Sequence, residues 1–311
     1  MSAFKLPFRG QTFKILQLTD IHYTDGDASD KKTLALITDL ITEEKPDLIM
    51  LTGDFLVGEK NTEDAAAALL PVTRSGIPWC FVFGNHDAEF GKGHDDLLDV
   101  LFSLPNVIPF PEVLGIHGKS NYTIDLTDAG GQLKWVLFGM DSNMYNKNPA
   151  VANYDYIQFD QIAWYRKIME QYEEKHSDFG ALAFFHIPLP EYNEVWNTRT
   201  CYGYKKEQVC CPLQNSGLFS TMLDMGHMRG TFAGHDHIND YWGELYGIKL
   251  CYGRATGYHT YGRRGFPRGG RIILLDRENT RDFKTYVRLA NGEVLEDFSV
   301  HQPNIKQKGK A

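Results

Sequence analysis

Five short apolar segments, each followed at once by residues that can bind a metal, constrain the fold of this chain more than any other feature. They span residues 13–18, 47–51, 79–83, 181–185 and 230–233. Apolar runs of this length, bounded by glycine and polar residues, indicate buried strands. In α/β proteins, sites collect at the carboxyl ends of the strands. We therefore expect the residues that follow these five strands to share one site.

Helical periodicity separates the first three segments. Apolar residues at positions 34, 37, 40 and 41 follow helical spacing after the candidate caps Asp27 and Ser29, and Lys45-Pro46 ends this helix. Further helices are expected over residues 62–73 and 94–102. This β-α-β-α-β succession predicts an α/β fold in which helices pack on a parallel sheet.

The second half of the chain adds antiparallel strands. Residues 122–126 and 134–139 indicate a hairpin, and more strands are expected at 272–275, 283–289 and 294–298, with a turn at Asn291-Gly292. Helices are expected over 159–175 and over 217–225, the latter capped by Ser216. Residues 188–215 have no periodicity, so we expect a long irregular excursion at the rim of the site.

The size and charge of the chain narrow its class. Its 311 residues fit a single domain at 1–311, with a motif core at 13–237, a strand-rich completion at 244–300 and a tail at 303–311. A net charge of -8 argues against the basic surface that nucleic acid requires. No apolar run is long enough to span a membrane. Residues 1–10 lack the apolar region of a secretory signal, so the chain as written is expected in the cytoplasm, or outside the cell if a signal was removed.

The cysteines predict reduced thiols. They are odd in number, and the chain is too large to need a disulfide framework: Cys80, Cys201, Cys210, Cys211 and Cys251. A disulfide from Cys201 to Cys210 or Cys211 is the alternative. These three residues lack a histidine at zinc-finger spacing, so no second metal site is predicted around them.

The polar clusters after the strands form an ordered set. They read Asp20-Ile21-His22, Gly53-Asp54, Gly84-Asn85-His86-Asp87, His186 and Gly234-His235-Asp236-His237. One such cluster alone is common in turns, but five in order, each after an apolar strand, indicate a site. Carboxylate, carboxamide and imidazole groups together suit Mn, Fe or Zn and suit calcium poorly.

This ordered set resembles the calcineurin-like metallophosphoesterase superfamily. Residues 185–191, 215–217 and 251–259 also resemble its small purple-acid-phosphatase-like branch of plants and microbes. The resemblance implies a metallophosphatase-type β-sandwich of mixed sheets flanked by helices, with the site at the carboxyl ends of the strands. It also implies two transition metal ions, divalent or trivalent. Asp20, His22 and His237 would hold one, Asn85, His186 and His235 the other, and Asp54 would bridge them.

The resemblance further implies in-line attack of a metal-bridging hydroxide on a phosphomonoester, with His86 as the general acid. Asp87 either orients His86 or holds a turn. Purple acid phosphatases have a tyrosinate ligand three residues after the bridging aspartate, where this chain has Val57. Their first motif ends in glycine, where this chain has His22. The coloured ferric-phenolate centre is therefore not expected.

Substrate contacts are less well marked. His259 either touches substrate phosphate or is structural, and a local arginine cluster either receives a phosphorylated substrate or lies in a solvated loop. That cluster comprises Arg254, Arg263, Arg264, Arg268 and Arg271. The expected substrate is a phosphorylated small molecule or a phosphoprotein. Phosphodiester or pyrophosphate cleavage is an alternative, and so is a binding scaffold without catalysis, although an intact His86 argues against the scaffold.

Overall fold

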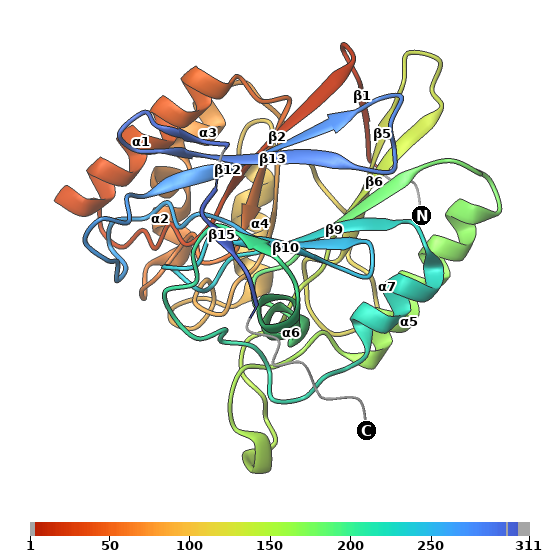
Figure 1. The fold of residues 1–311 in the computed structure, drawn as a ribbon. Coiled ribbons are helices and arrows are strands. Elements are labelled where there is room, and N and C mark those ends of the chain that lie inside the picture. The colour runs from red at the N-terminus through yellow and green to blue at the C-terminus, as the bar shows by residue number, and fades with distance from the viewer. Residues whose placement is uncertain (1–3, 297, 304–311) are drawn as a thin grey trace.

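Two stacked β-sheets with helices on their outer faces make up the protein (Figure 1). The structure, a computed structural model, describes residues 4–296 and 298–303. The expected metallophosphatase-type α/β sandwich of mixed sheets is confirmed. Within the described ranges, no helix combines the length and the apolar character needed to cross a membrane.

The six-stranded sheet carries the first three predicted strands side by side. Its order is β14-β13-β12-β2-β3-β4, with β2, β3 and β4 parallel and the other pairs antiparallel. The bounds are β2 Thr12–Leu18, β3 Leu48–Thr52, β4 Trp79–Val82, β12 Gly269–Asp276, β13 Phe283–Leu289 and β14 Val294–Leu295.

The nine-stranded sheet carries the other two strands predicted to precede ligands, β7 and β9. Its order is β1-β5-β6-β7-β9-β11-β10-β8-β15, and β6, β7, β9 and β11 run parallel. The bounds are β1 Phe4–Pro7, β5 Tyr122–Thr127, β6 Leu133–Gly139, β7 Gly180–Phe184, β8 Cys201–Tyr202, β9 Met228–Ala233, β10 Trp242–Leu245, β11 Ile248–Tyr252 and β15 Val300–His301.

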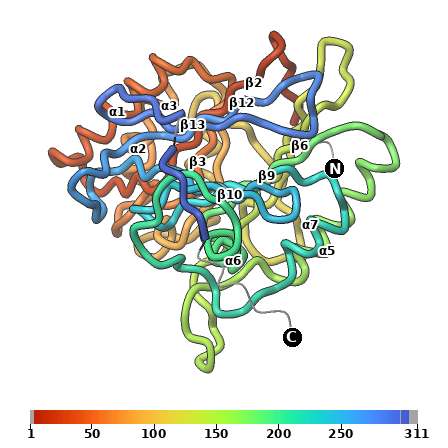
Figure 2. Tube along the Cα trace, in the orientation of Figure 1, coloured from red at the N-terminus to blue at the C-terminus, as the bar shows by residue number. Residues whose placement is uncertain are grey.

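The helices divide between the two sheets, as the colours in Figure 2 help to trace. Helices α1 to α4 precede β5 in the chain and pack beside the six-stranded sheet, whereas α5 to α7 pack on the nine-stranded sheet. The bounds are α1 Ala28–Glu44, α2 Asn61–Ala68, α3 Leu70–Arg74, α4 His94–Ser103, α5 Phe159–Glu173, α6 Glu191–Thr198 and α7 Leu218–Met225, with a short 3-10 helix at Pro149–Val151.

Side chains of the central strand β7 alternate between two apolar layers. Leu182 of β7 faces the six-stranded sheet and packs in one core with Leu16 and Ile49, whereas its neighbours Ala181 and Ala183 face α5 and α7. Successive strand residues point to opposite faces, so a strand covered on both faces is apolar throughout. This explains why the five segments lack polar alternation.

Some local predictions were wrong. The helix expected over 62–73 is two helices, because Pro71 lacks the N–H that would continue α2 into α3. Gly217, not Ser216, caps α7, in the left-handed conformation that glycine tolerates. Residues 188–215 are not wholly irregular, since they contain α6 and β8. Strands β8 and β15 were missed because each has only two residues, and β1 was missed because it is largely exposed and lacks an apolar run.

Other predictions agree with the structure. Asp27 caps α1 by accepting a hydrogen bond from the Asp30 amide, Gly292 makes the turn between β13 and β14, and all five cysteines are free thiols. Strand β14 is shorter than the expected 294–298, and residue 297 lies outside the described residues. Most of the predicted tail, 304–311, also lies outside them. The single-domain expectation stays a prediction.

Candidate metal centre

The five polar clusters meet where the two sheets come together. Asp20 follows β2, Asp54 follows β3 and Asn85 follows β4, while His186 and His235 follow the neighbouring strands β7 and β9. The two sheets are joined directly at this edge, because both carboxylate oxygens of Asp20 lie 3.1 Å from the His235 amide nitrogen. Ligands from distant parts of the sequence therefore converge.

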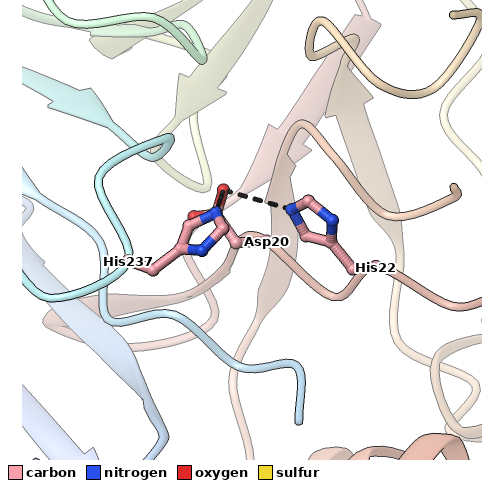
Figure 3. Close-up of side chains that lie close together, drawn as sticks. All are labelled: Asp20, His22 and His237. Carbon is pink, nitrogen blue, oxygen red and sulfur yellow. Dashed lines mark ion pairs between the residues drawn. The ribbon is translucent and has the colours of Figure 1, made fainter. Parts of the chain in front are cut away.

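The candidate ligands form two groups, in each of which the ligand atoms lie within 4.8 Å of one another. The first group is Asp20, His22 and His237, shown in Figure 3. In it, Asp20 Oδ1 lies 3.4 Å from His237 Nε2 and 4.0 Å from His22 Nε2. This is the set expected to hold one metal.

The second group is Asp54, His186 and His235. Asp54 Oδ2 lies 2.9 Å from His186 Nε2 and also 3.6 Å from His22 Nε2 of the first group. Asp54 therefore stands between the two groups, as a bridging ligand would.

Unsatisfied polar atoms test whether these residues suit a metal. His22 Nε2, Asn85 Oδ1 and His235 Nε2 are buried and have no hydrogen-bond partner within the described residues, and Asp54 Oδ2 has none there besides its ion pair with His186. Buried polar atoms are normally satisfied, so four such atoms at one place need an explanation. Two transition metal ions would complete all four, and the mixed nitrogen and oxygen donors suit them.

Neighbouring groups aim the ligand atoms. His186 Nδ1 lies 2.8 Å from the Thr52 carbonyl oxygen, which directs Nε2 to the site, and Thr260 Oγ1 contacts His237 Nδ1 in the same way. Asn85 Nδ2 donates to the Tyr145 hydroxyl at 3.2 Å, which leaves Oδ1 free. These contacts fix which atom of each side chain faces the centre.

The backbone at the site is strained. Asp20, His22, Asp54 and His235 have φ between 50° and 74°, a left-handed region that non-glycine residues rarely occupy. Such conformations cluster at functional sites. The glycines beside them allow close approach: a Cβ on Gly84 would lie 2.2 Å from Asp54 Oδ1, and one on Gly234 would lie 1.9 Å from Thr19 Oγ1.

Burial and mutual charge set the protonation of the ligands. Burial lowers the pKa of His22 to about 4 and that of His235 to about 3, so both imidazoles are neutral and able to ligate at neutral pH. Burial would raise the pKa of Asp20, but the adjacent His237 outweighs it and holds the value at about 2. Burial opposes protonation of His186, but the Asp54 carboxylate prevails and raises its pKa to about 10. A metal held by His186 would replace that proton.

Within the described residues, the Asp87 side chain makes no hydrogen bond to His86. Its fully buried carboxylate accepts hydrogen bonds from the backbone amides of Asp54, Phe55, Leu56 and Gly84, at 2.7 to 3.0 Å. Of the two roles considered for Asp87, the structure supports the one in the turn. It ties the loop after β3 to the loop after β4 and so positions Asp54.

Glu89 contacts His86 instead, which sequence analysis missed. Its carboxylate pairs with His86 Nδ1 and also accepts from the Tyr145 hydroxyl at 2.8 Å. The His86 side chain is 31% exposed, and its ring centroid lies 5.3 Å from that of His22. His86 thus lies between the ligand groups and solvent.

Two tyrosine rings also border the ligands. The Tyr154 ring packs edge-on against His235 with centroids 4.3 Å apart, and the Tyr261 ring stacks on His237 at 4.1 Å. Tyr145 and Tyr154 come from the segment between β6 and α5, which carries no motif that would have marked them.

The segment at 188–215 reaches the site through Glu207. Its carboxylate accepts from the Ile238 amide at 2.8 Å and from the Tyr261 hydroxyl at 2.7 Å, and the Cys210 amide donates to Asp236. These contacts involve the chain neighbours of His237 and the tyrosine that stacks on it. The expected position at the rim is therefore supported, although part of the segment is helical.

The two predicted substrate contacts, Arg254 and His259, differ in their exposure to solvent. Arg254 is only 2% exposed, and its guanidinium pairs with Asp240, so it is not carried forward as a substrate contact. A solvated loop was also the wrong prediction for Arg268 and Arg271, which are buried. His259 is partly exposed and lies 3.4 Å from Thr24 Oγ1 and 3.7 Å from Asp27 Oδ2. Its role stays a prediction.

Comparison with known proteins yields one consistent group. The sequence profile of the calcineurin-like phosphoesterase family matches residues 13–239. The chain is 34% identical over 307 residues to probable inactive purple acid phosphatase 29 of Arabidopsis thaliana, which covers 88% of this chain and 79% of the plant protein. It is 32% identical to phosphatase DCR2 of Saccharomyces cerevisiae, over 92% of this chain and 55% of the yeast protein.

A solved structure with a similar fold is also a phosphatase by name. A dimetal phosphatase from Danio rerio superposes with a TM-score of 0.57 at 13% identity, over 88% of this chain and 98% of the fish protein. At that identity the likeness concerns the fold alone. The sequence resemblance to this superfamily and to its purple-acid-phosphatase-like branch is confirmed.

Proposed function

The chain belongs to the calcineurin-like phosphoesterase family, and from this premise we propose that it hydrolyses phosphomonoesters at a centre of two transition metal ions. The observation that carries the proposal is the pair of ligand groups joined by Asp54, with buried ligand atoms left without a hydrogen-bond partner in the described structure. Metal ions held there supply Lewis acidity, which polarises a phosphoryl group and makes water a nucleophile near neutral pH.

In this proposal, the ligands divide between the two ions as the family resemblance implies. Asp20, His22 and His237 would hold one ion, and Asn85, His186 and His235 the other, with Asp54 shared. Either Mn, Fe or Zn fits these donors. Asp20 and Asp54 keep their negative charge at neutral pH, and His22 and His235 are neutral there. These four side chains can therefore bind cations without changing their protonation state. His186 is the exception, because it must lose a proton first.

His86 is the proposed proton donor to the leaving oxygen. Its Nδ1 is engaged by Glu89, so Nε2 is the nitrogen left to face the substrate. Its backbone amide donates to Asp54 Oδ1 at 2.8 Å, which places the residue beside the centre without making it a ligand. A partly exposed position suits a group that must exchange its proton with solvent.

A scaffold without catalysis is the second candidate, because the plant relative is named probable inactive. In this chain, however, all seven candidate ligand residues occur, and the carboxylate of Glu89 pairs with His86. A scaffold needs neither, so we favour catalysis. Monoester, diester and pyrophosphate substrates share the same metal core and are separated by experiment.

The test is a panel of phosphomonoesters, phosphodiesters and pyrophosphate, assayed with Mn, Fe and Zn. We expect metal in protein purified without chelator, monoesterase activity that excess EDTA abolishes, and loss of both metal and activity in Asp54→Asn. Asp224→Asn, an exposed carboxylate on α7, is the matched control. Full activity in EDTA after time for slow metal release would overturn the proposal, and a metal-loaded protein inactive on the whole panel would favour the scaffold.

A further inference from the structure

One arginine of the sequence cluster is buried with neither a counter-ion nor a hydrogen-bond partner for one of its guanidinium nitrogens. Arg254 pairs with Asp240, and Arg271 donates to the Tyr252 and Asp240 carbonyl oxygens and to Thr285. Arg268 is only 6% exposed, yet within the described ranges it has no carboxylate at ion-pair distance. Its Nη1 atom is buried and has no hydrogen-bond partner in that part of the chain.

An arrangement of this kind is unfavourable by itself. Removing a guanidinium from water costs free energy that a paired anion normally offsets, and an N–H left unsatisfied adds to that cost. Arg268 is only partly compensated: Nη2 donates to the carbonyl oxygens of Thr260 and Tyr261 at 2.8 and 2.7 Å. A bound anion would accept a hydrogen bond from the remaining donor, Nη1, and would offset the buried charge.

Arg268 adjoins the first ligand group. The two residues whose carbonyls it holds both contact His237, Thr260 through its hydroxyl and Tyr261 through its ring. Burial lowers the pKa of Arg268, while the Asp20 carboxylate acts in the opposite direction. An anion at Arg268 would therefore lie next to a phosphate held at the centre.

A hollow of about 370 Å³ opens at this place. Its walls include Tyr258, Thr260, Gly262, Arg263, Phe266 and Arg268. The side chain of Arg263 is exposed. It lines both this hollow and a neighbouring one, whose walls also include Arg264 and Lys206. Arg263 and Arg268 therefore line the first hollow, and Lys206 and Arg264 line the second beside one carboxylate, Glu293, in a chain whose net charge is -8. This local concentration of positive charge attracts anions even though the whole protein is acidic.

We propose that Arg268, with Arg263 at the mouth of the hollow, binds a second phosphate group of the substrate. The inference rests on the proposed function and names its substrate class, namely small organic molecules with two phosphates, one at the metal centre and one in the hollow. The planar guanidinium matches phosphate oxygens, and charge-assisted hydrogen bonds are the strong ones.

The kinetic test compares α,ω-alkanediol bisphosphates of two to six carbons with the matching alkyl monophosphates. We expect a lower KM for the bisphosphate at one or more chain lengths. Arg268→Gln should reduce this preference roughly 10- to 100-fold, as the loss of a charged hydrogen bond predicts. Arg263→Gln, which alters an exposed side chain, should reduce it less. Arg166→Gln on α5 is the matched control.

Two results would overturn the inference. One is a wild-type enzyme without preference for bisphosphates at any length. The other is an equal loss on bisphosphates and monophosphates in both variants with metal content intact, since Arg268 would then act on the scissile phosphate or on the position of His237. Arg263→Gln keeps the test decisive if Arg268→Gln fails to fold, because Arg263 makes no side-chain hydrogen bond in the described structure.

A second measurement separates this inference from the proposed function. In EDTA-treated protein, the melting temperature is compared in sulfate and in chloride at equal ionic strength. Stabilisation by sulfate in the wild type and in Arg166→Gln, reduced in Arg263→Gln and Arg268→Gln, supports the anion site even if no ester is hydrolysed. Identical responses in wild type and both variants would overturn it, whatever the enzyme hydrolyses.

Discussion

The Nδ1 atom of His86 pairs with the carboxylate of Glu89, three residues further along the chain. The other oxygen of that carboxylate accepts from Tyr145, whose hydroxyl accepts in turn from Asn85. The proposed proton donor and a proposed metal ligand are therefore held by one connected set of hydrogen bonds. The following predictions concern this set, the metals and the fold around them.

His86→Asn should lower the rate far more on alkyl phosphates than on p-nitrophenyl phosphate. A general acid contributes roughly 10²- to 10⁴-fold, and an alkoxide needs that proton whereas p-nitrophenolate leaves without it. Metal content should stay intact, since His86 is no ligand. Steady-state rates on both substrates, under conditions where chemistry is limiting, measure the effect. Equal losses would assign His86 to electrostatic stabilisation instead.

Glu89→Gln should cause a smaller loss with the same dependence on the leaving group. Gln keeps the size of the side chain but removes the charge that holds His86, so we expect roughly a tenfold loss on alkyl phosphates. Because Glu89 acts through His86, adding Glu89→Gln to His86→Asn should cost nothing further. The double mutant measures this directly. Additive losses would mean that Glu89 has a separate role at the centre.

Protein loaded with iron should lack the strong visible band of a ferric-tyrosinate centre. The position that supplies the tyrosinate in purple acid phosphatases is Val57 in this chain, and its side chain has no oxygen. An absorption spectrum of iron-loaded protein of known metal content provides the measurement. An intense band would instead require a tyrosine near the ligands, of which Tyr154, against His235, is the first to replace by Phe.

Glu44→Gln should destabilise the fold by about 2 kcal/mol at pH 7 and by less in acid. Glu44, at the end of α1, accepts from Lys14, Tyr286 and Arg288. Burial raises its pKa, but these three partners outweigh burial and hold the pKa below its usual value. A lowered carboxyl pKa stabilises the folded protein above the pKa of the unfolded chain, and this stability is lost as the pH falls.

The measurement for Glu44 is urea unfolding of wild type and variant between pH 7 and pH 4. The difference in free energy of unfolding should shrink toward the lower pH. Glu43→Gln, the exposed neighbour on the same helix, should show no such difference. A gap that does not change with pH would show that the contribution of Glu44 does not depend on its charge.

Much of the site could be predicted from sequence because it is encoded locally. Each ligand follows a run of apolar residues, and the period of a strand and the place where it ends are properties of a few neighbouring residues. The parallel order of β2, β3 and β4 then brings Asp20, Asp54 and Asn85 to one edge of the sheet. The grouping of the seven proposed ligands into two sets came from the family resemblance, and the distances among six of them, all but Asn85, are consistent with it.

Only the tertiary structure decided which polar side chains are paired. Asp87 binds amides more than 30 residues away, and Tyr145 meets Glu89 across 56 positions. The five clustered arginines look alike in sequence, yet the buried guanidinium groups of Arg254 and Arg271 find internal partners, whereas Arg268 keeps one nitrogen, Nη1, without a partner in the described structure. Pairing depends on which atoms the fold brings within about 3 Å, at what angle and how far from water, and spacing along the chain carries none of that information.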